Sequence, residues 1–574
     1  MRQTITLSSS HHGLDDLIAA LDGRSRVAVL AQDLIAPQAA LAPITEDPFS
    51  GTTALVALDR AGDLVVRHHR VVSAATSFHE VRDATHRSVG ALVIAPTDAQ
   101  AARDAINDLR SALIAGDLSL MPAEMLEAVM VALVRGQVPV RAVEIVDVPW
   151  FRAPDDVDAA TSAVEAESQQ RILGLLANRV DDGFYSTFVV RKASKPITRL
   201  ALRWGLSPNT ITVISFVVGI AAAVAFATGS WPWIVVGALL LQVSLVIDCV
   251  DGEVARATRK FSSLGAWLDA STDRVKEFAA YAGLAFGASR MDLTVFGLDV
   301  WWIAIAMMVL QTVRHVSDYD FARIQRLREA SVPAVDVRQP GDGRDLMGGG
   351  LAVAMDASAR MNRRSAIRWL KKVIHMPIGE RWLVLSVLAV LAGPAWALGG
   401  LLIAGIVAFG YVAVGRVTRT LTWSGVTPPE GPSVLRAQLD AGPLASVVGR
   451  VIPNTRPTLT GRFGWGVPVL LRAFELVAIA VLLLVVGVTS NLIVTFWIIF
   501  AIAYHHYDVL YRSLQGASPP RWLTWWGFGW DGRVLAVAIV ALTAVWEPSL
   551  AILLAWWVLW FAGVASVQWL RSSR

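Results

Sequence analysis

Long apolar runs alternate with short polar segments over the second two thirds of this chain. A membrane-spanning helix needs about 20 mostly apolar residues to cross about 30 Å of hydrocarbon. We expect such helices at residues 211–229, 231–247, 266–288, 299–317, 380–396, 398–415, 467–488, 491–507, 533–547 and 549–569. Ten spans place both chain ends on one side of the membrane.

Residues 1–165 follow a different pattern, in which short apolar runs are separated by amphipathic stretches. The runs at 26–30, 53–58, 90–95 and 140–148 are typical of buried strands. Their alternation with helical stretches predicts a soluble α/β domain with a doubly wound sheet. The expected fold class is therefore a soluble α/β domain followed by a polytopic α-helical membrane protein.

Two connectors separate the expected domains. Residues 166–205 end in RKASKPITRLALRWG, where basic and apolar residues interleave as in an amphipathic helix on a membrane surface. A plain solvated linker is the alternative. A second connector at 421–465 divides a six-helix core at 206–420 from a C-terminal membrane domain of unknown role at 466–574. The loop at about 320–377, which contains GDGRDLMGGG, is expected to be disordered or lid-like.

Composition supports a membrane protein. Of 574 residues, 54% are hydrophobic and only 17% are charged, which excludes an ordinary soluble protein. The net charge of +4 requires no nucleic-acid partner, and basic residues beside apolar runs suit lipid headgroups. A single cysteine, Cys249, excludes an intrachain disulfide. The first residues show no signal peptide, so we expect a cytoplasmic N-terminal domain in a plasma-membrane protein.

The candidate chemistry lies in DCVDGEVARATRKFSSLGAWLDASTD, which begins at Asp248. Asp248 and Asp251 share one helix face, and Asp269 and Asp273 share another. Two packed helices would bring four carboxylates together, at a cost in repulsion and desolvation that hard cations relieve. This predicts a site for two Mg²⁺ or Mn²⁺ ions, which can clamp a pyrophosphate.

The stretch satisfies the pattern D-x2-D-G-x2-A-R-x8-G-x3-D-x3-D at every fixed position. This pattern resembles that of the CDP-alcohol phosphotransferases, a family that is also called the CDP-alcohol phosphatidyltransferases. The resemblance implies an integral membrane enzyme of phospholipid or phospho-inositol synthesis. Such an enzyme moves a substituted phosphate from a CDP-alcohol to an acceptor alcohol and releases CMP.

The resemblance also implies roles for individual residues. It assigns Asp248, Asp251 and Asp269 to metal binding, and Asp273 both to a second ion and to the catalytic base. It implies a substrate pocket formed by Gly252, Ala255, Arg256, Ser262, Gly265, Asn209, Thr210, Ile211 and Thr212. For Ser262 and for the SPNT segment at 207–210, a plain helix start remains an equal alternative.

The N-terminal domain vaguely resembles a nucleotidyltransferase. An active enzyme of that kind would hold nucleotide phosphates with a Gly-rich, Arg-containing loop, whereas this chain has AQDLIAPQAALAP after the corresponding strand. We interpret the domain as inactive or regulatory, with an active cytidylyltransferase as the alternative.

In having such a fused domain, the chain is similar to enzymes that use CDP-inositol. We therefore rank an inositol-type acceptor, such as inositol phosphate, ahead of glycerol phosphate. Arg199, Arg314 and Arg381 would bind a phosphorylated acceptor or lie at the membrane interface. The expected partners are the two substrates and membrane lipids, with a homodimer as the oligomeric state to test.

Two other function classes stay open. Intramembrane carboxylates also mark ion-coupled transporters, although the Asp-rich motif has no repeat in the second half. An inactive membrane scaffold is the third possibility. In the tail, His505 and Asp508 share a helix face; a polar helix end at the membrane interface is favoured there over a metal or proton site.

Overall fold

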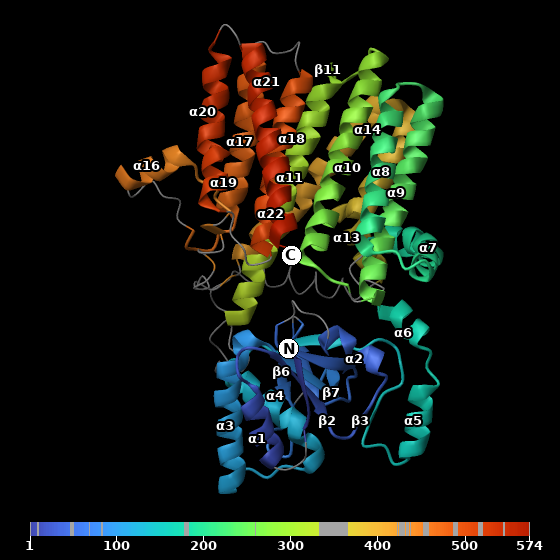
Figure 1. Ribbon diagram of the computed structural model, residues 1–574, viewed down its shortest axis with the longest axis vertical. Coiled ribbons are helices and arrows are strands. Elements are labelled where there is room, and N and C mark those ends of the chain that lie inside the picture. Colours follow the sequence, from blue (N-terminus) through green and yellow to red (C-terminus); the bar gives the residue numbers. More distant parts are fainter. Residues whose placement is uncertain are drawn as a thin grey trace. The chain divides into compact units, whose positions relative to one another are not determined.

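The computed structural model contains two compact units (Figure 1). One comprises Met1–Arg179 with Glu329–Arg344, and the other comprises Val180–Arg328 with Asp345–Arg574. The structure describes residues 2–7, 11–45, 51–67, 69–81, 84–176, 183–258, 260–331, 365–421, 423, 431, 435–436, 438–451, 459–485, 492–514, 520–543 and 546–572. The GDGRDLMGGG segment lies outside these residues.

The first unit is a sheet with helices on both faces. Its strand order is β1-β2-β7-β4-β8-β6-β5. One face packs against α1, α3 and α4, and the other packs against α2, so the predicted α/β architecture is confirmed. The elements are β1 (Arg2–Leu7), α1 (His11–Ala20), β2 (Arg26–Ala31), β3 (Leu34–Ile35), α2 (Gln38–Thr45), β4 (Thr53–Leu58), β5 (Leu64–Arg67), β6 (Arg70–Ala74), β7 (His86–Ile94), α3 (Ala99–Ala115), α4 (Met125–Arg135), β8 (Arg141–Glu144), β9 (Phe151–Arg152), α5 (Val157–Glu165) and α6 (Gln169–Leu176).

The sheet is mixed, so the expectation of a doubly wound sheet is wrong. Strand β7 is antiparallel to both of its neighbours, β2 and β4, while β1–β2 and β4–β8 are parallel. One further antiparallel pair, β5–β6, follows from a short connection. Parallel neighbours need a crossover of about a dozen residues or more. The chain instead passes from β5 to β6 through residues 68–69, and these two strands pair antiparallel.

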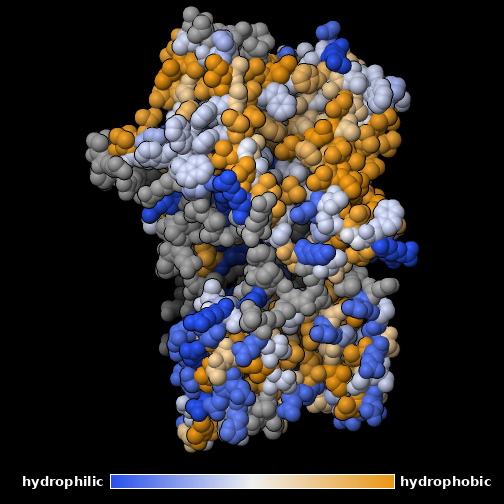
Figure 2. All heavy atoms as spheres, viewed as in Figure 1, coloured by the Kyte–Doolittle hydropathy of each residue, from blue (hydrophilic) through white to orange (hydrophobic). Residues whose placement is uncertain are grey.

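The second unit is a bundle of long helices whose visible face is largely apolar (Figure 2). Short strands β10 (Thr294–Val295) and β11 (Leu298–Asp299) join two of the helices. The helices are α7 (Arg191–Arg203), α8 (Pro208–Ala227), α9 (Trp231–Thr258), α10 (Ser263–Arg290), α11 (Val300–Ser331), α13 (Ser365–His375), α14 (Ile378–Leu421), α16 (Pro443–Val451), α17 (Gly466–Val485), α18 (Leu492–Leu514), α19 (Arg521–Trp526), α20 (Gly529–Ala541), α21 (Trp546–Trp557) and α22 (Ala565–Ser572).

Among the described residues, seven helices are long and apolar enough to cross a membrane, and the chain is a multi-pass membrane protein. They are Pro208–Ala227, Trp231–Thr258, Val300–Arg328, Ile378–Leu421, Gly466–Leu484, Leu492–Leu514 and Pro548–Arg571. Helix α14 contains two of the ten expected spans, because it bends at Gly393 (φ 88°) before Pro394.

Two expected spans are absent from this set for different reasons. Helix α10 has 28 residues but carries several charged side chains. Helix α20 has 13 residues, about 20 Å of helix, which is shorter than the hydrocarbon layer.

Helices α8 and α10 approach each other closely at two glycines. A Cβ atom at Gly283 would lie 2.2 Å from the carbonyl oxygen of Ala223, and one at Gly287 would lie 2.2 Å from that of Phe226. Small residues spaced four apart allow such backbone contact between membrane helices. These glycines set the distance between the two helices.

The C-terminal helices share a hydrophobic core with the preceding ones. Phe278 of α10 packs against Phe500 of α18, with ring centroids 5.9 Å apart. Near the other end of α10, Trp267 stacks on Trp569 of α22 at 5.5 Å. The region at 466–574 is therefore packed directly on α10.

His505 and Asp508 are both buried, so the expected interfacial helix end is wrong. His505 Nε2 lies 3.1 Å from Asp440 Oδ2, which also accepts a 2.7 Å hydrogen bond from Arg533. Asp508 instead accepts hydrogen bonds from Arg512 and from the indole of Trp569. Although His505 and Asp508 share a helix face, they belong to separate ion-pair groups.

Substituting alanine at Gly283 should destabilise the protein by about 1–3 kcal/mol, because α8 and α10 must separate to admit the methyl group. The midpoint of thermal unfolding in detergent measures the effect. Gly410→Ala is the matched control, since a Cβ there meets nothing within 4 Å. Equal midpoints for the two variants would contradict the close packing.

Candidate active site

The four aspartates of the motif lie on α9 and α10, which follow each other through a short turn. Asp248 and Asp251 are on α9, which continues beyond the apolar run at 231–247 to Thr258. Asp269 and Asp273 lie in the first half of α10. The acids therefore sit within two helices of the bundle.

Three of these carboxylates converge. Oxygen atoms of Asp248, Asp251 and Asp269 all lie within 4.8 Å of one another. Asp251 is buried and the other two are half-buried. This set of oxygen donors fits a hard divalent cation such as Mg²⁺ or Mn²⁺. Asp273 lies outside the group of three, although the sequence pattern predicted four converging acids.

Two hydroxyl groups of α8 hold these carboxylates. Thr212 Oγ1 donates a 2.5 Å hydrogen bond to Asp251 Oδ2, and Ser215 Oγ donates a 3.1 Å bond to Asp248 Oδ1. Thr212 was expected to line the nucleotide pocket, but its hydroxyl orients a predicted metal ligand. Ser215 was not predicted; it lies three residues after Thr212, on the same helix face.

Lys276 is the main residue that sequence reasoning missed. It is fully buried, and its Nζ lies 2.5 Å from Asp248 Oδ1 and 2.9 Å from Asp273 Oδ1. The signal was present in the sequence, because Lys276 follows Asp273 by three residues and so shares its helix face. A lysine in an apolar stretch beside the acidic motif pointed to an ion pair.

The predicted glycines lie where side chains from neighbouring elements approach. A Cβ at Gly265 would lie 2.9 Å from Asn209 Oδ1 and 2.9 Å from Ser262 Oγ. One at Gly252 would lie 3.1 Å from the Arg256 guanidinium. The structure thus brings Asn209, Ser262 and Gly265 together, and it brings Gly252 and Arg256 together.

Other predicted pocket residues have structural roles. Ser262 is the N-cap of α10 and accepts a hydrogen bond from the Gly265 amide. Thr210 is exposed and its amide is capped by Ser207. Ile211 is buried among apolar residues of α7 and α9, so its side chain packs rather than lining a pocket. Ala255 is half-buried on α9.

Arg314 and Arg381 do not face the aspartates. Arg381 is buried and pairs with Glu277, with Nε 2.8 Å from Oε1. Arg314 is also buried, and it donates to the carbonyl oxygens of His375 and Met376. Both guanidiniums thus bind protein groups, and their proposed role in binding a phosphorylated acceptor stays a prediction. Arg199 is exposed on α7.

Helix α7 is fixed to α9 through Glu253. This carboxylate is buried and accepts hydrogen bonds from Arg191 (2.7 Å), Ser194 (2.7 Å) and Thr198 (2.5 Å). Glu253 lies between Gly252 and Arg256 of the motif. Its partners belong to α7, whereas Asp248 and Asp251 bind hydroxyl groups of α8. The connector before α8 is therefore bound to the helix that carries the acids.

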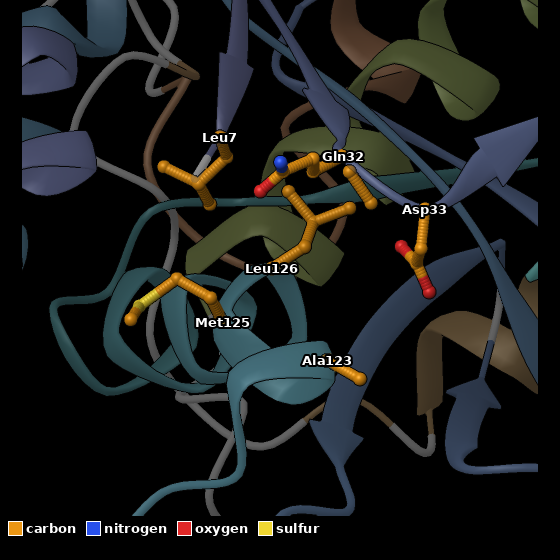
Figure 3. Close-up of a pocket in the computed structure, with 7 residues that line it drawn as sticks. Leu7, Gln32, Asp33, Ala123, Met125 and Leu126 are labelled. Carbon is orange, nitrogen blue, oxygen red and sulfur yellow. The ribbon is translucent and has the colours of Figure 1, made fainter. Parts of the chain in front are cut away.

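A separate pocket of about 360 Å³ lies in the N-terminal unit (Figure 3). None of its seven lining residues is basic: they are Leu7, Ala31, Gln32, Asp33, Ala123, Met125 and Leu126. Arg152 pairs with Asp33 at 2.8 Å and with Glu127 at 2.9 Å. The pocket thus presents a carboxylate where nucleotide phosphates would need positive charge.

Comparison with known proteins gives two family matches. Residues 205–333 match the CDP-alcohol phosphatidyltransferase family. Residues 444–573 match a family of unknown function, DUF5941.

Curated relatives match part of the chain. A phosphatidylinositol phosphate synthase of Mycolicibacterium smegmatis is 31% identical over 135 residues, 23% of this chain and 57% of that protein. An archaetidylinositol phosphate synthase of Pyrococcus horikoshii is 31% identical over 111 residues, 19% of this chain and 57% of that protein. A bifunctional IPC transferase and DIPP synthase of Aquifex aeolicus is 32% identical over 154 residues, 26% of this chain and 32% of that protein.

The chain therefore spans between a third and three fifths of the length of these relatives. The matched segment contains the whole eight-residue motif together with α8, α9 and α10. Residues 205–333 are therefore the part of the chain that is similar to the CDP-alcohol phosphatidyltransferase family.

Proposed function

We propose that this protein is a membrane transferase that moves a substituted phosphate from a CDP-alcohol to an acceptor alcohol and releases CMP. The observation that carries the proposal is the convergence of Asp248, Asp251 and Asp269 on two helices inside the family match. An inactive scaffold would not need three oxygen donors within 4.8 Å of one another beside the other motif residues. A transporter could use such donors, but the family match of this segment favours the transferase.

In this proposal Asp248, Asp251 and Asp269 hold divalent metal, Mg²⁺ or Mn²⁺. Metal bound there would neutralise the pyrophosphate of the donor and orient it for in-line displacement. Thr212 and Ser215 keep two of these carboxylates oriented through the hydrogen bonds described above. The predicted second ion would also need Asp273, which is instead paired with Lys276.

Asp273 is the proposed base. It lies one helical turn beyond Asp269, and the ion pair with Lys276 holds its carboxylate in place. It would take the proton of the acceptor hydroxyl while that oxygen bonds to the β-phosphorus of the CDP-alcohol. The bond from this phosphorus to CMP breaks at the same centre, so the products are the phosphodiester and CMP.

The pocket around this centre would bind the donor. Gly252 and Gly265 allow close approach to the backbone, and Arg256 offers a fork of donors for phosphate. Asn209 lies against Gly265 and is a further candidate contact, together with Thr210, Ala255 and Ser262. The relatives are named for inositol phosphate products, which supports an inositol-phosphate-type acceptor.

We further propose that the site opens to the cytoplasm. Figure 1 shows α7, α13 and α22 at one end of the helical bundle. Helix α7 carries five basic residues, and the last turns of α14 and α22 carry Arg419 and Arg571. This distribution agrees with the rule that positively charged residues remain on the cytoplasmic side.

The experiment that tests the function is release of radiolabelled CMP by the purified protein, with a panel of CDP-alcohols and acceptor alcohols. Asp273→Asn should lower turnover about 100-fold or more while CDP-alcohol binding is largely kept, because asparagine cannot accept the proton. Asp269→Asn, the matched control, should weaken metal and nucleotide binding together. Near wild-type turnover of Asp273→Asn would contradict the assignment of the base.

Thr212→Val should weaken metal affinity about 10- to 100-fold, because Asp251 loses the hydroxyl that orients it. Calorimetric titration with Mn²⁺ measures the change. Thr418→Val is the control, since that hydroxyl bonds only to carbonyl oxygens of its own helix among the described residues. Unchanged affinity of Thr212→Val would show that Asp251 is not a metal ligand.

The N-terminal unit should be dispensable for the transfer. All the proposed site residues lie in the second unit, and the pocket of the first lacks basic lining residues. A chain that begins at residue 180 should retain CMP release in detergent. The isolated unit should release no pyrophosphate from CTP and a phosphorylated alcohol, and release would restore the active-cytidylyltransferase alternative.

A further inference from the structure

The side chain of Lys276 fills a space between neighbouring helices. A Cβ at Gly219 of α8 would lie 2.7 Å from Lys276 Cδ, so the absence of a side chain there makes room for the lysine. The Trp382 ring lies 5.5 Å from the ammonium nitrogen, in cation–π range. Residues of α8 and α14 thus enclose a lysine that projects from α10.

The ammonium group lies against one edge of the acidic site. Its Nζ is bound by Asp248 Oδ1 at 2.5 Å and Asp273 Oδ1 at 2.9 Å, and it donates a 2.9 Å hydrogen bond to Ser215. A buried ammonium needs partners of this kind, because an unpaired charge is costly inside a protein. Here the ammonium group donates hydrogen bonds to Ser215 and Asp248, and it forms an ion pair with Asp273.

The same two carboxylates are the ones that could hold a second divalent ion at this edge of the site. Asp273 lies outside the group of three converging acids. An ion held jointly by Asp273 and Asp248 would lie between the two carboxylates that Lys276 contacts. Mg²⁺ binds oxygen at about 2.0–2.1 Å. An ion at that distance from both oxygens would adjoin the Lys276 ammonium, and the two positive groups would repel each other.

We propose that Lys276 takes the place of a second metal ion, so that the site binds one divalent ion at Asp248, Asp251 and Asp269. The inference rests on the proposed transferase function and deepens it. Lys276 pairs with both carboxylates of the Asp248–Asp273 edge and acts as a positioning residue for the base. The protein therefore differs from the two-ion arrangement expected from the motif alone.

The test counts Mn²⁺ bound to the full-length protein in detergent, by loss of the electron paramagnetic resonance signal of free Mn²⁺. The wild type should bind one tight ion per chain, without magnetic coupling. Lys276→Met should bind two coupled ions, because paired sites lie about 3.5–4 Å apart. Lys276→Arg keeps a cation and should bind one.

Lys192→Met is the matched control, since Lys192 is exposed on α7, and it should bind one ion. Two coupled ions in the wild type would overturn the proposal, and so would a single ion in a folded Lys276→Met variant. If that variant does not fold, the wild-type count still decides the question.

The CMP assay separates this inference from the proposed function. A protein that binds one Mn²⁺ but releases no CMP would reject the transferase function and leave the ion count in place. A protein that releases CMP while it binds two coupled ions would reject the role of Lys276 alone.

Discussion

The structure of the membrane unit depends on the cost of holding four carboxylates close together within an apolar helical bundle. Unpaired charges there repel each other and lose hydration. Hydroxyl groups of α8 bind two of the acids, and Lys276 pairs with Asp248 and Asp273. Glycines of α8 and α10 then permit the close helix contact that these short bonds require.

Much of this arrangement could be predicted from the sequence. Apolar run length located most of the helices, and the spacing of the acids placed Asp248, Asp251 and Asp269 at one point. Periodicity also separated the α/β unit from the bundle. These features are local, because they depend on residues within one or two adjacent elements.

The remainder depends on contacts between distant segments. The mixed sheet follows from strand pairing that alternation of elements does not specify. His505 pairs with Asp440, and Arg381 pairs with Glu277, only when the helices are packed together. Hydropathy suggested that these polar residues lie at the membrane interface. Hydropathy is averaged over a short window of the sequence, so it does not include a charged partner from a distant segment. For Lys276, the spacing indicates the pair with Asp273 on its own helix, but not the pair with Asp248 on another helix.

Helix α10 links the proposed chemistry to the C-terminal region of unknown function. One face carries Asp269 and Asp273, while Trp267 and Phe278 pack against α22 and α18. The position of a carboxylate along a helix is only as fixed as the packing of that helix, and a displacement of about 1 Å can matter for catalysis. The C-terminal helices therefore form part of the scaffold that positions α10, and their contribution to the site is mechanical even though they supply none of the proposed ligands.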